Sequence, residues 1–287
     1  MIRTRAGLAL LPLAFCSTVA LGVQQPEDTT GLEPYLKDRG RGIATSMFGT
    51  YIRKGEWIVY PFYEYTKTTG FEYAPEELGF TGTDEHFGTL TEHEWLLWVA
   101  YGLTDRLEVE VEGALHASAT FEKAPDDLSA VPPRIEESGL GDVEAQVRWR
   151  WSGETERRPE LFSFFEVVFP FQKDNVVLGT QDWEYELGFA AIKGHSWGTL
   201  TGRVALAYDS VDGSLESGEY AVEYLKKVSQ KWQFLAAIEG DQTDEIEAIF
   251  EGQARLGKHV TLKLNSGFGI TKKAPDVAPE IGVMFRF

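Results

Sequence analysis

The stretch DVEAQVRWRW, residues 142–151, alternates strictly between polar and apolar side chains. Its five odd-numbered residues, from Val143 to Trp151, are apolar, and they would all lie on one face of a β-strand because successive strand residues point to opposite faces. A helix would spread the intervening charged residues around its circumference. The stretch therefore predicts a strand with one apolar face and one charged face.

The same period-two pattern recurs along most of the chain, in segments long enough to cross a bilayer obliquely, which takes roughly 9 to 11 residues. An even number of strands places both termini on one side of the membrane, which is the periplasm for an outer-membrane barrel. The expected strands are 56–69, 89–102, 106–120, 140–151, 160–171, 181–193, 199–210, 219–229, 232–241, 245–256, 260–271 and 278–287.

The first residues have the pattern of a secretory signal peptide. Arg3 and Arg5 precede an apolar run at 8–21, and small residues follow near Val23. The run is shorter than the roughly 20 apolar residues of a membrane-spanning helix. We therefore expect a signal peptide at 1–23, a periplasmic N-terminal arm at 24–55 and an outer-membrane barrel at 56–287. Cys16, the only cysteine, falls inside the signal, so the mature chain has no disulfide.

Aromatic residues gather at both ends of the predicted strands. Two such girdles suit the two membrane interfaces, where an amphipathic ring lies at the level of the lipid headgroups. A soluble β-sandwich also alternates, but it accounts neither for the girdles nor for the C-terminal Phe287. The predicted fold class is an all-β, transmembrane, antiparallel up-and-down β-barrel of about 12 strands. The periplasmic girdle comprises Trp57, Tyr101, Trp149, Trp151, Trp197, Trp232, Phe285 and Phe287, and the outer girdle comprises Tyr63, Tyr65, Trp183, Tyr208, Tyr220 and Phe268.

The faces predicted to point into the barrel are rich in carboxylates. A wall of this sign would favour cations and repel anions. A packed interior is the competing interpretation, because Glu108 beside Arg150 and Glu110 beside Arg148 would form cross-strand pairs, and a barrel of this size lies between filled and open ones. The candidate lumen-lining residues are Glu92, Glu94, Glu108, Glu110, Glu112, Glu144, Arg148, Arg150, Glu184, Glu186, Arg203, Glu247, Glu251 and Arg255.

Three short motifs resemble a known family. They are YGLTDR at 101–106, SGLGD at 138–142 and the terminal FRF at 285–287. With the strand lengths, they are similar to a family of outer-membrane transporters named after the meta-pathway of phenol degradation. The resemblance covers residues 56–287 and implies uptake of aromatic compounds through a barrel. It carries no defined site residues over to this chain.

The sequence predicts no catalytic residues, no metal site and no cofactor. The five histidines do not converge with ligand spacing: His86 lies in an outer loop, His93 on the lipid side and His116 near the outer rim, facing inward. His195 beside Ser196 is the only pairing of a base with a nucleophile, and the two would point to opposite faces. A membrane-embedded hydrolase is therefore a poor alternative, and we expect that the protein is not an enzyme.

We expect a Gram-negative outer-membrane channel or transporter, porin-like, that passes small molecules passively through an acidic lumen. Aromatic or hydrophobic compounds are candidate cargo, because Ile58, Tyr60, Phe62, Leu96 and Trp98 would form an apolar patch that either binds them or plugs the bore. The alternative is a structural or adhesive barrel with a filled interior. Expected partners are outer-membrane lipid and lipopolysaccharide, the barrel assembly machinery through the strand ending in Phe287, and the cargo. A net charge of −18 argues against nucleic acid.

Overall fold

The computed structural model describes residues 31–172, 174–210, 213, 215–241 and 244–287. The predicted signal peptide lies outside these residues. One 3-10 helix, η1 (Pro34–Leu36), is followed by fifteen strands: β1 (Ile43–Ala44), β2 (Tyr51–Ile52), β3 (Trp57–Tyr73), β4 (His86–Gly102), β5 (Leu107–Lys123), β6 (Arg134–Gly139), β7 (Val143–Ser152), β8 (Glu160–Phe169), β9 (Glu184–His195), β10 (Gly198–Asp209), β11 (Leu215–Lys227), β12 (Trp232–Gly240), β13 (Ile246–Arg255), β14 (Val260–Gly269) and β15 (Ala278–Arg286).

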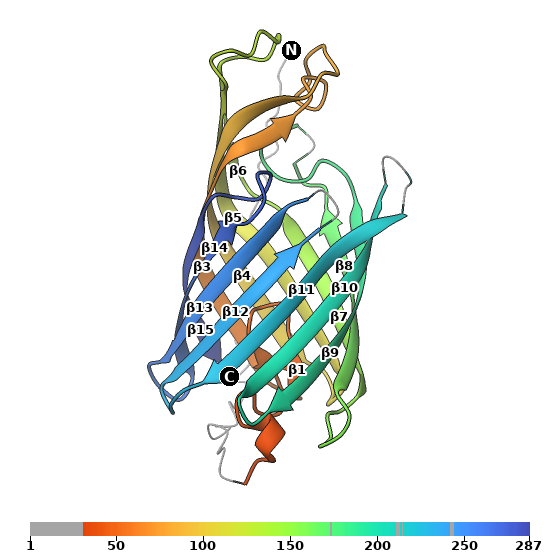
Figure 1. Cartoon of the computed structure of the whole chain (residues 1–287), viewed down its shortest axis with the longest axis vertical. Helices are drawn as coiled ribbons and strands as arrows, with labels where there is room; N and C mark the ends of the chain where they lie inside the picture. The colour runs from red at the N-terminus through yellow and green to blue at the C-terminus, as the bar shows by residue number, and fades with distance from the viewer. Residues whose placement is uncertain (1–30, 173, 211–212, 214, 242–243) are drawn as a thin grey trace, which may run out of the picture.

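Twelve of these strands close into one antiparallel barrel (Figure 1). Neighbours in the wall are neighbours in the chain, and β15 returns to pair with β3. The seam is sealed where the backbone groups of Trp57 and Phe287 exchange hydrogen bonds of 3.0 and 2.9 Å. Closure leaves no open sheet edge in the hydrocarbon region, which is what a lipid environment requires. The predicted fold class is confirmed.

Each of the twelve predicted segments overlaps one wall strand, and the largest difference lies beside β7. Residues 134–139, expected to be loop, form β6, which pairs with the far part of β5 while β7 pairs with its near part. The sequence RIEESG carries only one large apolar residue, so it has no period-two signal. It forms a strand because β5 extends beyond the end of β7, and the backbone of residues 134–139 pairs with that extension.

The predicted register between β5 and β7 is wrong by two residues. Glu108 lies opposite Arg148, and Glu110 lies opposite Gln146. The Arg148–Glu110 ion pair forms nevertheless, along the diagonal, with Nε 3.2 Å from Oε1. The shift arises at the irregular link between β6 and β7, where Gly141 and Asp142 both bond to the backbone of Ala114, and strand periodicity alone does not count such extra residues.

The outward face of the wall is apolar and exposed, as a lipid-facing surface must be. Trp57, Trp149 and Trp197 lie exposed at one end of the strands, and Tyr208 and Phe268 at the other. His116 is also exposed, because a bulge at Trp95 and Leu96 shifts the pairing there, so its predicted inward orientation is wrong. Within the described part of the chain, no helix is both long enough and apolar enough to span a membrane.

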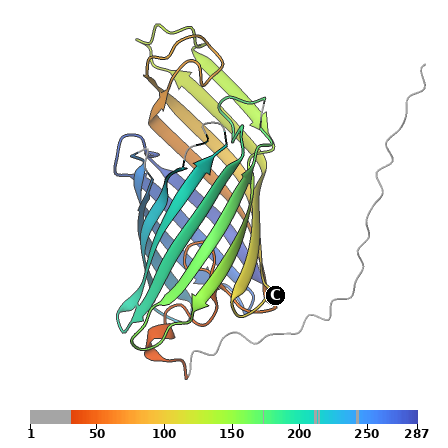
Figure 2. The same ribbon diagram turned by 90° about the vertical axis from the view of Figure 1, so that its right-hand side faces the viewer.

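The two ends of the barrel differ. At one end, here called the plug end, the strands are joined by short turns and lie close to η1 and Phe287 (Figure 1). At the other, the loop end, β3 to β6 rise well above the rim as a projecting sheet (Figure 2). Its inner face has an apolar core that includes Tyr73, Phe121 and, from the connection between β8 and β9, Leu178.

A closed barrel predicts heat-dependent mobility on a denaturing gel. A closed barrel resists detergent until it is heated, because all its wall hydrogen bonds break together. The refolded mature chain should therefore migrate differently in boiled and unboiled samples on a denaturing gel. A soluble product with the same mobility in both samples would contradict the fold.

Candidate functional site

Residues 38–56 enter the barrel from the plug end and form a short hairpin inside it, here called the plug. Strands β1 and β2 pair through Ile43 with Ile52 and Ala44 with Tyr51. The tip between them is closed by backbone hydrogen bonds from Thr45 to Thr50 and from Thr50 to Met47, each 3.0 Å. Gly49 turns the tip with a φ of +58°, a conformation that favours glycine.

The apolar face of the plug is buried against the lumen wall. Ile43 and Ile52 pack with Ile58, Tyr60 and Trp98 of β3 and β4, all at most 1% exposed. On the opposite side Ala44 and Tyr51 pack within a second cluster that spans β8 to β13. The apolar wall patch expected from the sequence therefore holds the plug. Burying side chains of this size contributes roughly 1.5–3 kcal/mol each.

Polar side chains of the wall hold the plug tip through its backbone. From one side, Gln253 Nε2 and Lys263 Nζ donate to the carbonyl of Phe48 at 3.1 and 3.3 Å, and Gln233 Nε2 donates to Gly49 at 3.3 Å. From the other, Arg148 donates to the carbonyl of Ala44 at 3.2 Å. The tip is thus tied to strands on both sides of the lumen.

Ser46 makes two further hydrogen bonds between the plug and the lumen wall. Ser46 N donates to Glu110 at 3.3 Å, and Trp98 Nε1 donates to Ser46 Oγ at 3.2 Å. Glu110 also receives Arg148, so one wall carboxylate joins the plug to the ion pair of β5 and β7. Buried polar groups need such partners, since an unpaired one costs roughly 1–3 kcal/mol.

The base of the plug is fixed by ion pairs. Arg39 contacts Glu160 at 2.8 Å and Glu154 at 3.1 Å, and its side chain is 1% exposed. Burial lowers the pKa of Arg39, but the charges of Glu160, Tyr51 and Glu154 outweigh it, so the pKa lies above its ordinary value. Asp38 receives Lys226 at 3.3 Å. A permanently charged guanidinium therefore anchors the segment.

Beyond the plug tip lies a cavity of about 350 Å³, here called the carboxylate chamber. Ser46, Met47 and Phe48 form its floor. A separate gap beside the hairpin measures only about 10 Å³, which is roughly the space needed for one water. The charged wall residues of the carboxylate chamber are Glu64, Glu112, Glu144, Arg148, Glu166, Glu186, Arg203, Glu219, Glu239, Glu247 and Glu280.

The residues predicted to line the lumen fall into several zones. Six of them line the chamber: Glu112, Glu144, Arg148, Glu186, Arg203 and Glu247. Glu108, Glu110 and Glu251 are buried in the wall at the level of the plug. Glu92 and Glu94 are half-buried toward the loop end, and Glu184 is exposed there. Arg150 pairs with Glu160 at 3.1 Å, and Arg255 lines a cavity at the plug end.

Sequence reasoning missed the residues that hold the plug. Gln233, Gln253 and Lys263 lie on inward positions, but nothing in the pattern of their strands says that they bind a backbone carbonyl. Glu239 obeys the period-two rule of β12 and could have been found by it. Glu219 could have been found in the same way, because it shares the parity of Ala221 and Glu223 on β11.

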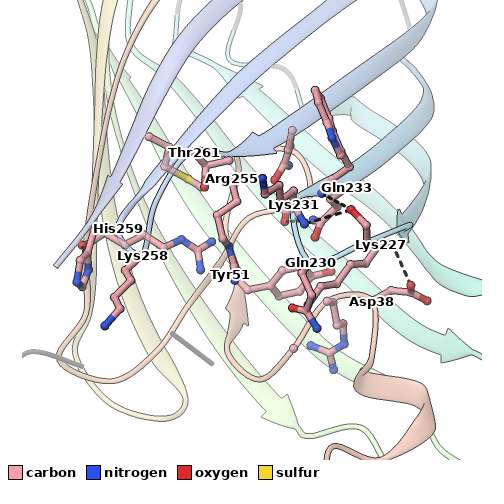
Figure 3. A pocket seen from close by; sticks show the side chains of 18 of the residues that line it. Asp38, Tyr51, Lys227, Gln230, Lys231, Gln233, Arg255, Lys258, His259 and Thr261 are labelled. Carbon is pink, nitrogen blue, oxygen red and sulfur yellow. Dashed lines mark hydrogen bonds between the residues drawn. The ribbon is translucent and has the colours of Figure 1, made fainter. Parts of the chain in front are cut away.

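On the plug-end side a second cavity, about 110 Å³, lies between the plug and strands β11 to β15; we call it the basic vestibule (Figure 3). Its lining has two acidic side chains, Asp38 and Glu56, and the terminal residue Phe287. Both acidic side chains are paired, Asp38 with Lys226 and Glu56 with Arg53. The basic side chains are Lys37, Arg39, Arg53, Lys227, Lys231, Arg255, Lys258 and Arg286.

No cluster of three or more histidine, cysteine or acidic side chains with metal-binding geometry occurs in residues 31–287, apart from the few positions left undescribed. The charge and the shape of the lumen define the candidate site. It is a lumen divided by a plug, with carboxylates on one side and mostly basic groups on the other.

No family model matches the sequence, and no curated protein matches it. Solved structures do. An outer-membrane channel from Pseudomonas putida F1 aligns over 85% of this chain and 100% of its own, with a TM-score of 0.60 and 15% identity. The translocator domain of the autotransporter NalP from Neisseria meningitidis aligns over 82% and 90%, with a TM-score of 0.52 and 13% identity.

The porin KdgM, in complex with disordered oligogalacturonate, aligns over 80% of this chain and 99% of its own, with a TM-score of 0.50 and 8% identity. Identities this low show a shared fold alone. The chain has the fold of outer-membrane β-barrels, and its membership of the family named after phenol degradation stays a prediction.

The ion pairs at the plug base give a test of how the plug is held. Arg39→Gln removes the charge between Glu154 and Glu160, and breaking a buried pair costs about 3 kcal/mol. Amide hydrogen exchange reports local opening, so exchange in residues 43–52 should quicken by on the order of 100-fold, since about 1.4 kcal/mol is tenfold. The exposed Arg134→Gln is the matched control. Equal exchange in all three proteins would contradict the role of Arg39.

Proposed function

We propose that this protein is an outer-membrane channel for passive passage of small molecules, closed in the described state by its own plug. The observation that carries the proposal is the carboxylate chamber, a cavity of about 350 Å³ inside a closed transmembrane barrel with the plug tip as its floor. A barrel that served only as a scaffold would not need a chamber lined by charged groups in its interior.

The charge of the chamber indicates which solutes would pass. Nine glutamates line it against two arginines. Arg203 is engaged by Glu239 at 2.7 Å and Glu219 at 3.6 Å, and Arg148 by Glu110 at 3.2 Å. The remaining carboxylates would attract cations and repel anions, as rings of acidic side chains do in cation-selective pores.

Passage requires the plug to shift. The plug is held by a few polar contacts and by apolar packing, and it has only two short strands of its own. Segments with few internal hydrogen bonds open at a lower free energy than the surrounding sheet. Gating would therefore consist of plug displacement, with the barrel wall unchanged.

A structural barrel is the second candidate, and the plug itself favours it. Residues on both faces of the hairpin are buried, and the gap beside it admits roughly one water. A barrel whose plug never moves would insert into membranes without conducting.

The orientation of the barrel in the membrane, its partners and its cargo are part of the same proposal. The plug end would face the periplasm, because short turns and both termini mark that side in bacterial barrels. Phe287 would be read by the assembly machinery, and lipopolysaccharide would contact the outer wall. Aromatic cargo is supported by the family resemblance.

Conductance in a planar bilayer tests the proposal. The wild-type chain should show a low conductance, and Arg39→Gln should raise the open fraction at least tenfold because the plug base is released. Arg134→Gln, which removes an exposed arginine outside the lumen, should behave as wild type. Robust insertion with no conductance in any of the three would favour the structural barrel.

Ion selectivity tests the role of the chamber charge. In the Arg39→Gln background, Glu144→Gln with Glu247→Gln should move the reversal potential in a KCl gradient toward zero, because two wall charges are lost. The matched control, Glu76→Gln with Glu156→Gln, removes two exposed carboxylates outside the chamber. An unchanged reversal potential in the chamber variant would refute selectivity by these glutamates.

A further inference from the structure

The basic vestibule has the opposite charge to the rest of the molecule. The chain carries a net charge of −18. Yet the vestibule lining has eight basic side chains against Asp38, Glu56 and the terminal carboxylate of Phe287. Lysines and arginines scattered at random over so acidic a chain would rarely face one cavity with so few acids.

The two acidic side chains in the vestibule are already paired with basic groups. Asp38 accepts from Lys226 Nζ at 3.3 Å and from the backbone of Lys227 at 3.0 Å. Glu56 accepts from Arg53 at 3.0 Å, and Arg39 is matched by Glu154 and Glu160. The local positive charge is therefore carried by other groups.

Arg255, Lys258 and Lys231 make no side-chain hydrogen bond or ion pair within the described residues. Arg255 ends β13, Lys258 lies in the turn to β14, and Lys231 lies in the turn before β12. Figure 3 shows Arg255, Lys231 and Lys258, with Tyr51 of the plug, among the side chains that line this cavity. Several unmatched cations therefore converge from different turns.

We propose that the basic vestibule binds a small oxyanion, a phosphate or carboxylate group, between the turns of β11–β12 and β13–β14 and the plug. A guanidinium and two ammonium groups supply charge-assisted donors, the strongest hydrogen-bond type for such anions. Its volume of about 110 Å³ corresponds to a few water molecules, which suits a compact group. The site stands apart from transport, since it can be occupied in a barrel that never conducts.

Two sources could supply this chemistry, a free solute or the phosphate of an anionic lipid headgroup. The vestibule is lined by inward residues such as Tyr51, Gln253 and Met284 as well as by the turns. A free solute reaches such a place more easily than a headgroup whose acyl chains lie on the outer wall. The experiment separates the two.

The first arm is calorimetric titration of the refolded mature chain with inorganic phosphate, in neutral detergent at low ionic strength. We expect saturable binding that Arg255→Gln with Lys258→Gln weakens at least tenfold. Arg157→Gln with Arg158→Gln is the matched control: it removes two exposed arginines from the turn after β7, outside the vestibule, and should leave the affinity within about twofold.

Heat-modifiable gel mobility checks that each variant is folded, and the single variant Lys231→Gln provides a milder test if the double variant does not refold. No saturable binding by the wild type, or equal weakening in the vestibule and control variants, would overturn the site.

Repeating the titration in nanodiscs identifies the source of the oxyanion. A phosphate affinity that is equal in zwitterionic and anionic lipid supports a free solute. Loss of phosphate binding only in anionic lipid keeps the oxyanion site but assigns it to a headgroup.

Discussion

The pairing of β15 with β3 is the constraint on which the rest of the structure depends. In lipid an unpaired strand edge is too costly to persist, so the last strand has to return to the first. Closing twelve strands sets the width of the lumen. Barrels of about eight strands fill with their own side chains, whereas twelve leave space that the wall cannot fill. The plug occupies part of that space, with the carboxylate chamber on one side of it and the basic vestibule on the other.

The plug covers apolar residues of the lumen wall that would otherwise be exposed to water. Inward positions of β3 and β4 include Ile58, Tyr60 and Trp98, which would be wetted in an open pore. The plug covers them with Ile43 and Ile52, while Lys263 and Arg148 bind its backbone carbonyls. The same residues thus hold the plug without continuous strand pairing to the wall. The proposed displacement of the plug needs an interface of this kind, which can be lost as a unit.

Most of the wall could be predicted from sequence because alternation is a local property. Residues 142–151 show both faces of a strand without knowledge of any partner. Register is not local: the link at Gly141 and Asp142 shifted β7 by two residues relative to the predicted pairing. The division of the predicted lumen residues into chamber, wall and vestibule also depends on where the plug lies.

The plug was beyond sequence reasoning for a different reason. Strands of two residues carry no period, and Gly42, Gly49 and Gly55 contributed to the prediction of residues 24–55 as a polar arm. The only sequence signal was indirect: an apolar wall patch that either binds cargo or plugs the bore. Only the structure of the hairpin decides between cargo binding and plugging, because the residue that packs against a buried wall residue can lie far away in the chain.

The plug separates the lumen into two compartments, and labelling of single cysteines tests this separation most directly. Residues 24–287 contain no cysteine, so Met47→Cys at the floor of the chamber and Thr261→Cys in the vestibule place one thiol on each side of the plug in a chain that begins at residue 24. In vesicles with one orientation, a small membrane-impermeant thiol reagent added at the loop end should modify the first variant and spare the second. Addition at the plug end should give the reverse. Modification of both thiols from either side would show a continuous lumen and contradict the account.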